Sequence, residues 1–154
     1  MKILYLIHQY LPDSIGGTEV LLHDLAESMQ AEGHDAAIFA YRESLDSNPA
    51  SFGTRIEEVD GVRVYRFHFN LSIHPNVATG EFRNAFAEQA LNTVIEDFSP
   101  DVAHVVHAMK LGGGIFKTLA AEGIPIITSL SDYSYFCLRY NLLLPDHSPC
   151  TSGP

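Results

Sequence analysis

The chain alternates short apolar runs with longer stretches in which apolar residues recur every three or four positions. The short runs are rich in β-branched residues and predict buried strands, whereas the recurring pattern predicts amphipathic helices. Strands are expected at 3–7, 35–41, 102–106 and 124–130, and helices from about 18 to 33, from about 79 to 98 and from 112–114 to 123. Because strands and helices alternate, the pattern predicts an α/β fold, a Rossmann-like parallel sheet with helices on both faces.

One interruption of this alternation predicts a β-hairpin insertion. The dipeptide Asp60-Gly61 separates two runs of alternating residues, 54–59 and 62–67, and is a strong signal for a two-residue hairpin turn. The remaining stretches are expected to be loops at 42–53 and 68–76 and a short helix followed by a loop at 132–144.

The same spacing predicts which side chains face the core. In the first helix Leu21, Leu25 and Met29, with Leu22 beside them, form the expected apolar face; in the long helix it is Phe82, Phe86, Ala90, Val94 and Phe98, widened by Leu91 and Ile95. In the hairpin, Val62, Val64 and Arg66 would share one side because successive strand residues alternate between faces.

Composition narrows the class of protein. The 154 residues fit one domain, and the 46% hydrophobic content supplies enough apolar material for a core. A formal net charge of −10 argues against nucleic acid as a partner, because phosphate binding needs clustered cations. Two cysteines are typical of a reducing compartment, and the apolar start is too short for a signal peptide or membrane span, so a cytoplasmic protein is expected.

Histidines mark the edge of the sheet where a ligand is expected, since open α/β sheets bind ligands beyond the carboxyl ends of their strands. His8 follows the first strand, and His107 ends the strand at 102–106. Loop packing is the alternative for His8. His104 lies within the strand and is expected to be a core residue, and no Cys or carboxylate has the spacing of a metal site, so no metal is predicted.

The loop after the last expected strand carries a second polar group, Ser131-Asp132-Tyr133, with Arg139 further along. Ser131 and Asp132 can hydrogen-bond a sugar hydroxyl, and Arg139 can hold an anionic group. The structural alternative is that Ser131 or Asp132 caps a short helix and Arg139 lies on the surface. Spacing alone leaves both alternatives open.

A pair of glycines precedes the first helix, in Gly16-Gly17-Thr18. Glycines at a helix start let a ligand approach the backbone, and the unpaired N–H groups there attract anions such as phosphate. The spacing is neither that of a dinucleotide-binding fingerprint nor that of a P-loop. A tight turn before a helix is the alternative.

Four ordered segments resemble the N-terminal domain of the family 4 glycosyltransferases, which have the GT-B fold. They are the strand and glycine loop ending in Gly16-Gly17-Thr18-Glu19, the strand entry Gly33-His34-Asp35, the segment Asp101-Val-Ala-His104-Val-Val-His107, and Gly123-Ile-Pro-Ile-Ile-Thr-Ser-Leu-Ser-Asp-Tyr133. The resemblance covers nearly the whole chain. Each segment alone is weakly specific, but the ordered set is fairly specific.

The resemblance implies that residues 1–154 form a single acceptor-side domain and that the nucleotide-sugar domain of a two-domain enzyme is absent from this chain. Such enzymes move a sugar from a nucleotide-sugar co-substrate to a glycan or lipid-linked acceptor, with retention of configuration and generally without a metal or other cofactor. The tail from Cys137 to Cys150 is similar to relatives from bacterial polysaccharide pathways. A cytoplasmic enzyme, in some cases peripheral at the inner face of the membrane, would follow.

By position, the resemblance implies that Gly16 and Gly17 approach the donor phosphates, while His107 and the loop at 131–133 line the acceptor and reaction centre. Ser131 and Asp132 are then the catalytic candidates. Many relatives have His-Asp where this chain has Ser131-Asp132, and a hydroxyl is a poor base near pH 7. Two alternatives stay open: a non-catalytic binding module that kept the fold, and a standalone flavodoxin-like or nucleotide-binding domain.

Overall fold

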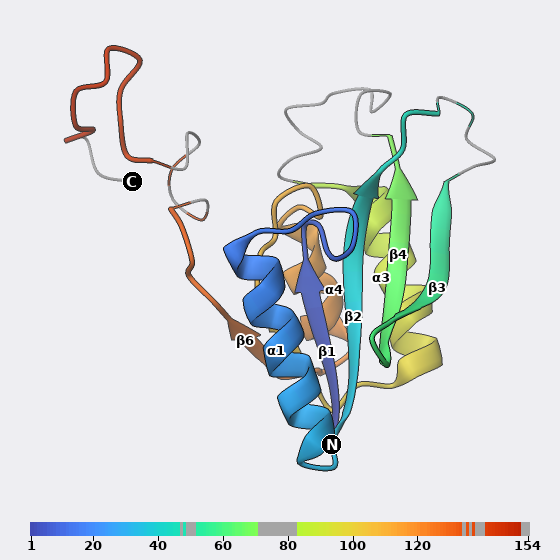
Figure 1. The fold of residues 1–154 in the computed structure, drawn as a ribbon. Helices are drawn as coiled ribbons and strands as arrows, with labels where there is room; N and C mark the ends of the chain where they lie inside the picture. Colours follow the sequence, from blue (N-terminus) through green and yellow to red (C-terminus); the bar gives the residue numbers. More distant parts are fainter. Residues whose placement is uncertain are drawn as a thin grey trace.

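The structure is a computed structural model, and it describes residues 1–46, 48, 52–70, 83–133, 135, 137 and 141–151. Within these residues six strands form one sheet in the order β3-β4-β2-β1-β5-β6 (Figure 1). The strands are β1 (Lys2–Ile7), β2 (Asp35–Glu43), β3 (Gly53–Val59), β4 (Val62–Phe69), β5 (Val102–Val105) and β6 (Ile126–Thr128). The helices are α1 (Gly17–Ala31), α3 (Ala85–Phe98) and α4 (Gly114–Ala121).

The sheet is parallel except for one edge. Strands β4, β2, β1, β5 and β6 run parallel, whereas β3 pairs antiparallel with β4 through the turn at Asp60-Gly61. The predicted hairpin insertion is therefore confirmed, and it makes the sheet mixed. From β1, the chain order grows outward through β2 on one side and through β5 on the other, so the sheet reverses its order between β1 and β5. Ligands of open α/β sheets bind at this switch point.

Helices cover both faces, as predicted. In Figure 1, α1 crosses the near face of the sheet and α3 and α4 lie behind it. Each face has its own core, because alternate strand residues point to opposite sides. The α1 side buries Ile3, Tyr5, Ile7, Ile38, Val62 and Val64 against Leu22 and Ala26, and the other side buries Leu4, Leu6, Phe39, Tyr65 and Phe67 against Leu91, Val94, Phe98 and Leu119.

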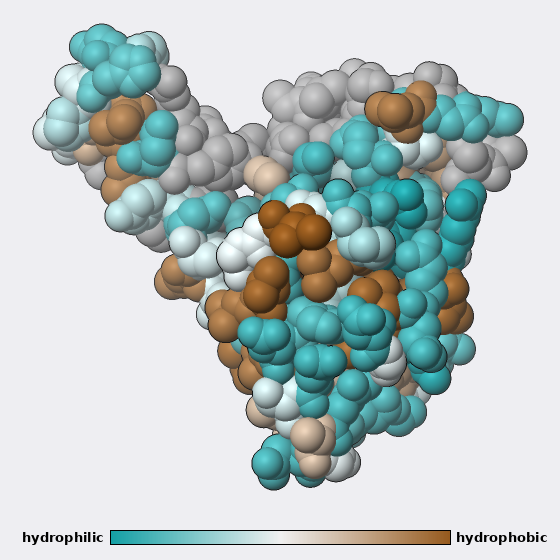
Figure 2. Space-filling model, in the orientation of Figure 1, coloured by the Kyte–Doolittle hydropathy of each residue, from teal (hydrophilic) through white to brown (hydrophobic). Residues whose placement is uncertain are grey.

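The predicted face of α1 is confirmed for Leu22, which is buried, and for Leu25 and Met29, which pack partly buried against the core, but it is wrong for Leu21. Leu22 and Ala26 are buried, whereas Leu21 is 65% exposed and lies beside the half-exposed Val20. Apolar side chains consequently gather on the surface over the start of α1, visible as brown spheres in the middle of Figure 2. Neighbouring leucines satisfy a four-residue spacing in two registers, so periodicity alone did not distinguish the buried row from the exposed one.

The long helix begins later than predicted, and among the described residues its predicted core face is confirmed except at Phe86. It begins at Ala85, because the Asn84 side chain accepts a hydrogen bond from the backbone N–H of Ala87 at 3.2 Å and caps the helix. The expected start at 79–82 lies outside the described residues, as does Phe82. Phe86 is 50% exposed rather than part of the core face, which is formed by Ala87, Leu91, Val94, Ile95 and Phe98.

Strand lengths also differ from the prediction. Strand β2 extends to Glu43 and β4 to Phe69, because the two strands keep pairing through Arg42–His68 and Glu43–Phe69, where loops were predicted. At the other edge, β6 is shorter than the predicted strand, since only β5 pairs with it. The described part of 132–144 contains no helix, in contrast to the predicted short helix there.

Candidate functional site

Two buried histidines meet at the switch point of the sheet. His8 follows β1 and His107 lies two residues after β5, and because these strands are parallel neighbours their carboxyl ends coincide. The ring centroids of His8 and His107 are 4.3 Å apart, and both side chains are buried. The structure thus brings together two residues that were predicted for one edge from separate strands.

Asp132 completes this cluster from the loop after β6. Its Oδ2 atom lies 2.8 Å from Nε2 of His107. The other ring nitrogen, Nδ1, accepts a hydrogen bond from the backbone N–H of Met109 at 3.2 Å. With Nδ1 accepting, the proton of the neutral imidazole sits on Nε2 and is donated to the Asp132 carboxylate. The predicted catalytic residue Asp132 therefore orients His107 directly.

His8 is a neutral imidazole at neutral pH. Burial, followed by the neighbouring His107, lowers the pKa of His8 from 6.5 to about 4, although the carboxylates of Glu19 and Asp132 act in the opposite direction. In the described part of the molecule its Nδ1 atom is buried without a hydrogen-bond partner. Leaving such an atom unpaired costs about 1–3 kcal/mol, so His8 is not placed there by stability alone.

The rest of the predicted loop is more open. Ser131 and Tyr133 are exposed, and Ser131 makes no hydrogen bond with the described residues. Arg139 lies outside the described residues, so its predicted role in holding an anion stays a prediction. Of the residues at 131–133, Asp132 is therefore the one that the structure joins to the histidines.

The glycine loop forms the start of α1, as predicted, but a carboxylate already lies over it. The Glu19 side chain is buried and accepts hydrogen bonds from Nε2 of Gln9 at 2.7 Å and Oγ of Ser14 at 3.2 Å. Burial alone would raise the pKa of Glu19. The hydrogen bonds from Gln9, Ser14 and the Glu19 backbone N–H together lower it by more, so the net shift of the pKa is downward. A Cβ atom at Gly16 would lie 2.6 Å from the Glu19 carboxylate, which explains the glycine.

A phosphate at this loop would have to share the helix start with Glu19. A Cβ at Gly17 would meet no atom within 4 Å, so space for a ligand lies on that side of the loop rather than at Gly16. The predicted donor contact of Gly16, Gly17 and Thr18 remains a prediction. Glu19 was missed as a site residue, although an acid at the third position of a helix is a recognisable capping signal.

A polar cavity of about 240 Å³ opens beside His8, across the ends of β1, β2 and β4. Its lining residues are His8, Gln9, Tyr10, Asp13, Ser14, Tyr41, Arg42, Glu43, Arg66 and Lys110. Lys110 belongs to the loop after β5. A hydrogen bond from Asn84 Nδ2 to the Lys110 carbonyl, at 3.0 Å, holds this loop in place. Gly112 closes this loop at a φ of +79°, where a Cβ would lie 2.8 Å from the Asn84 backbone nitrogen.

Arg66 holds the loop after β1 against β4. Its guanidinium is fully buried, donates to the carbonyls of Tyr10 and Leu11 at 3.3 and 2.7 Å, and pairs with Glu57 at 3.1 Å. Strand alternation placed Arg66 on the side of Val62 and Val64, but no role was predicted for it. A cation at the next alternate position of a strand, after two buried valines, is the sequence signal that could have predicted this ion pair.

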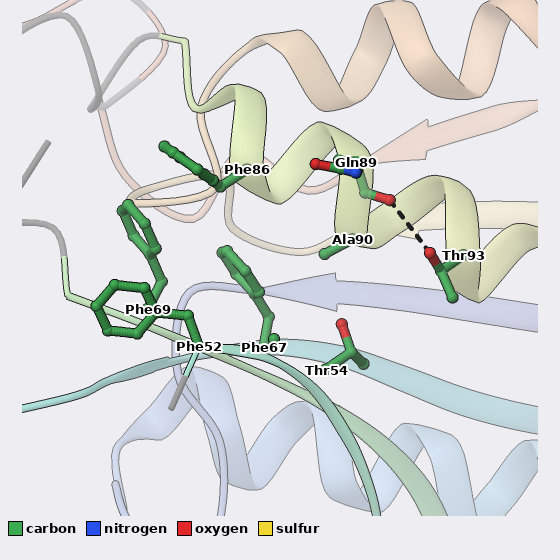
Figure 3. A pocket seen from close by; sticks show the side chains of 9 residues that line it. Phe52, Thr54, Phe67, Phe69, Phe86, Gln89, Ala90 and Thr93 are labelled. Carbon is green, nitrogen blue, oxygen red and sulfur yellow. Dashed lines mark hydrogen bonds between the residues drawn. The ribbon is translucent and has the colours of Figure 1, made fainter. Parts of the chain in front are cut away.

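A second cavity, of about 380 Å³, lies between β3, β4 and α3. Figure 3 shows the rings of Phe52, Phe67 and Phe69 on the sheet side and Phe86 on α3. The polar residues of its lining are Thr54, Gln89 and Thr93. The Thr93 hydroxyl donates a hydrogen bond to the Gln89 carbonyl at 3.4 Å. This cavity is larger than the polar one but offers no titratable side chain for chemistry.

Two further features bear on the predictions. His104, expected in the core, is partly buried in β5, with Nε2 lying 2.8 Å from the Ser129 hydroxyl, and burial lowers its pKa. Within the described ranges, neither a cluster of potential metal ligands nor a helix long and apolar enough to cross a membrane is found.

Fold and site together define an α/β domain with a polar cluster and cavity at the switch point of its sheet. Residues 16–150 match the model of the family described as glycosyl transferase 4-like domain. The chain therefore belongs to this family of glycosyltransferase domains, as its resemblance to family 4 implied. The search of curated proteins found no matching sequence.

One solved structure supports the fold. The chain is similar to sucrose-phosphate synthase from Thermosynechococcus elongatus, with a TM-score of 0.53 and 13% identity over 82% of this chain and 32% of that one. It also matches trehalose-6-phosphate synthase from E. coli bound with UDP-2-fluoro glucose, with a TM-score of 0.46 and 11% identity over 80% and 31% of the two chains. The chain has a Rossmann-like GT-B domain fold and spans about a third of the first of these structures.

Proposed function

We propose that this chain is the acceptor-binding domain of a retaining glycosyltransferase that moves a sugar from a nucleotide sugar to a glycan or lipid-linked acceptor. The observation that carries the proposal is the His8–His107–Asp132 cluster, which lies at the switch point of the sheet beside a polar cavity. Family membership supplies the class of reaction. Synthesis of a bacterial surface polysaccharide, on the cytoplasmic side of the membrane, is the setting we propose.

In this role the cluster would form one wall of the reaction centre. The Nδ1 atom of the neutral His8 ring can exchange a hydrogen bond with a sugar hydroxyl. Both ring nitrogens of His107 are bonded within the protein, to Asp132 and to the Met109 N–H, so His107 would position His8, and the Asp132 carboxylate holds His107 in one tautomer. A second domain would bring the nucleotide sugar to this edge, with its phosphates near Gly17. Because the donor and acceptor would bind on opposite walls, the domain alone would transfer no sugar.

The test is turnover by the full-length protein that contains this chain. The purified protein is incubated with a panel of nucleotide sugars, and release of the nucleoside diphosphate is measured with and without glycan and lipid-linked acceptors. We expect one donor to be consumed, with the anomeric configuration retained in the product. Failure of a folded protein to transfer or hydrolyse any donor would contradict the proposal.

One observation favours a second candidate, a binding module without catalysis. Ser131 stands where many relatives have a histidine, and it is exposed and has no hydrogen bond within the described structure. The variant Ser131→His in the full-length protein separates the two candidates. Gain of transfer by this variant over an inactive parent would indicate a degenerate site, whereas an active parent would exclude the second candidate.

A further inference from the structure

The polar cavity beside the histidines contains both signs of charge. Arg42, Arg66 and Lys110 contribute cations, and Asp13 and Glu43 contribute carboxylates. The cavity volume of about 240 Å³ equals the liquid volume of roughly eight water molecules. This is room for one sugar ring.

Each cation of the cavity is matched by a carboxylate. Arg42 pairs with Asp13 at 3.0 Å, and Lys110 pairs with Glu43 at 3.4 Å. Arg66 pairs with Glu57 at 3.1 Å and lies 3.7 Å from Asp13. Counting Glu57, three cations face three carboxylates among the described residues, so these side chains together offer no net charge to an anion.

Balanced ion pairs suit hydroxyl groups. A sugar hydroxyl donates one hydrogen bond and accepts others, so it can donate to a carboxylate such as Asp13 while accepting from a guanidinium such as Arg42. A phosphate can only accept at these positions when fully ionised. To enter, it would have to separate Arg42 from Asp13 and then lie beside the released carboxylate, which like-charge repulsion disfavours.

The neighbouring histidine provides an independent indication of a ligand. The His8 ring lines the cavity and is buried, and its Nδ1 atom is unpaired within the described residues. His8 also contacts His107 at a centroid distance of 4.3 Å. A sugar held in the cavity would therefore lie next to the cluster proposed as the reaction centre.

We propose that this cavity binds the sugar of the acceptor and is selective for an uncharged sugar over a sugar phosphate. That the bound sugar belongs to the acceptor rests on the proposed function. The preference for an uncharged sugar depends only on the paired charges of the cavity. Removing one carboxylate should leave an uncompensated cation and shift the preference toward phosphate.

The experiment measures binding to the full-length protein by ligand-observed NMR. The probes are the methyl glycosides of glucose, galactose and mannose and the 6-phosphate of each sugar. We expect at least one glycoside to bind about tenfold more tightly than its 6-phosphate. In Asp13→Asn this ratio should fall about tenfold, because the variant keeps the shape of the side chain and removes one negative charge.

Two further variants complete the test. Glu43→Gln removes the partner of Lys110 and should change the ratio in the same direction, which keeps the test informative if Asp13→Asn fails to fold. Glu58→Gln makes the same change of charge on an exposed residue of β3 outside the cavity and should leave the ratio unchanged. Tighter binding of the phosphates to the unsubstituted protein, equal ratios in all variants, or no binding of any glycoside would overturn the inference.

The outcomes separate this inference from the proposed function. Donor turnover combined with a preference for sugar phosphates would leave the glycosyltransferase proposal standing and contradict the uncharged-sugar cavity. Selective binding of a glycoside by a protein that consumes no donor would support the cavity and contradict catalysis.

Discussion

The two cavities of this domain are built partly from consecutive residues of one strand, yet they have opposite chemistry. Arg66 of β4 lines the polar cavity, and Phe67 and Phe69 of the same strand line the apolar one. Because alternate strand residues point to opposite faces, β4 separates charge from aromatic surface. The smaller cavity is the one beside the histidine cluster at the switch point, so position in the fold identifies the candidate site better than volume does.

The two cavities also differ in what keeps them in shape. The polar cavity depends on paired charges such as Arg66–Glu57, whose geometry is directional. The apolar cavity depends on the packing of rings, such as Phe67 on Phe69 at a centroid distance of 5.7 Å. Substitutions should therefore disturb the two cavities through different energies, and the following experiments use that difference.

The largest effect is expected for Arg66→Met. Removing this cation leaves the carbonyls of Tyr10 and Leu11 and the one-third exposed carboxylate of Glu57 without their donor. Three lost hydrogen bonds, at about 1–1.5 kcal/mol each, lower the free energy of unfolding by about 3–5 kcal/mol. Urea denaturation followed by circular dichroism measures this loss. Arg55→Met, at an exposed position of β3, is the matched control and should change the free energy by less than about 0.5 kcal/mol. Equal losses in the two variants would contradict the role given to Arg66.

A similar loss is expected on the apolar side for Phe67→Ala, but through a void rather than an unpaired charge. Phe67 is buried, and truncating a buried Phe lowers the free energy of unfolding by about 3–5 kcal/mol. Phe86 lines the same cavity but is half-exposed, so Phe86→Ala should lower the free energy of unfolding by less than about 1 kcal/mol. Thermal or urea unfolding of both variants checks the contrast, and a Phe86 loss as large as that of Phe67 would show that the cavity is closed in solution.

A smaller, functional effect is expected for Asp132→Asn. The amide oxygen can still accept from Nε2–H of His107, but the bond loses its charge, which weakens it by about 1.4 kcal/mol. In the full-length enzyme the turnover number should fall roughly tenfold, while the unfolding curve stays nearly unchanged. Steady-state kinetics provide the measurement. Full turnover in this variant would remove Asp132 from the site.

An effect of similar size is expected in the dependence of stability on pH through His8. Its pKa is about 4 in the folded protein against 6.5 without burial, so between these values the unfolded chain binds the extra proton. Stability must then fall as the pH decreases, by about 1–2 kcal/mol between pH 7.5 and 5.0 for this residue. The free energy of unfolding is measured at pH 7.5 and 5.0 for the wild type and for His8→Gln. Subtracting the change in the variant from the change in the wild type removes the contributions of His68 and His104, which both proteins share. A difference of zero would place His8 in contact with water.

The sequence predicted features that depend on local pattern and on strand ends. The hairpin at Asp60-Gly61 and the joint placement of His8 and His107 are confirmed because turn chemistry and parallel strands leave few alternatives. On α1 the prediction was wrong for Leu21 but not for Leu22, Leu25 and Met29, since Leu21 and Leu22 both fit helical spacing and only tertiary packing selects one.

The sequence signals that Arg66 is buried, but it does not identify the partners of Arg66 or Glu19. Arg66 contacts the carbonyls of residues 10 and 11, and Glu19 folds over Gly16 only because Gln9 and Ser14 are nearby. These contacts depend on how loops meet in space. The hydrogen bond from His107 to Asp132 likewise joins residues 25 positions apart, although both had been proposed separately as site residues.

The most direct test of the central claim compares His107→Gln with His104→Gln in the full-length protein. Both residues belong to one segment, but His107 lies in the cluster with His8 and Asp132, whereas His104 lies against Ser129 within the sheet. The measurement is the rate of nucleoside diphosphate release from the preferred nucleotide sugar with acceptor present. The account predicts a loss of about 100-fold for His107→Gln, because losing the ring that contacts His8 and binds Asp132 would displace the reacting groups, and nearly full activity for His104→Gln. Equal activity in the two variants, or a greater loss for His104→Gln, would contradict it.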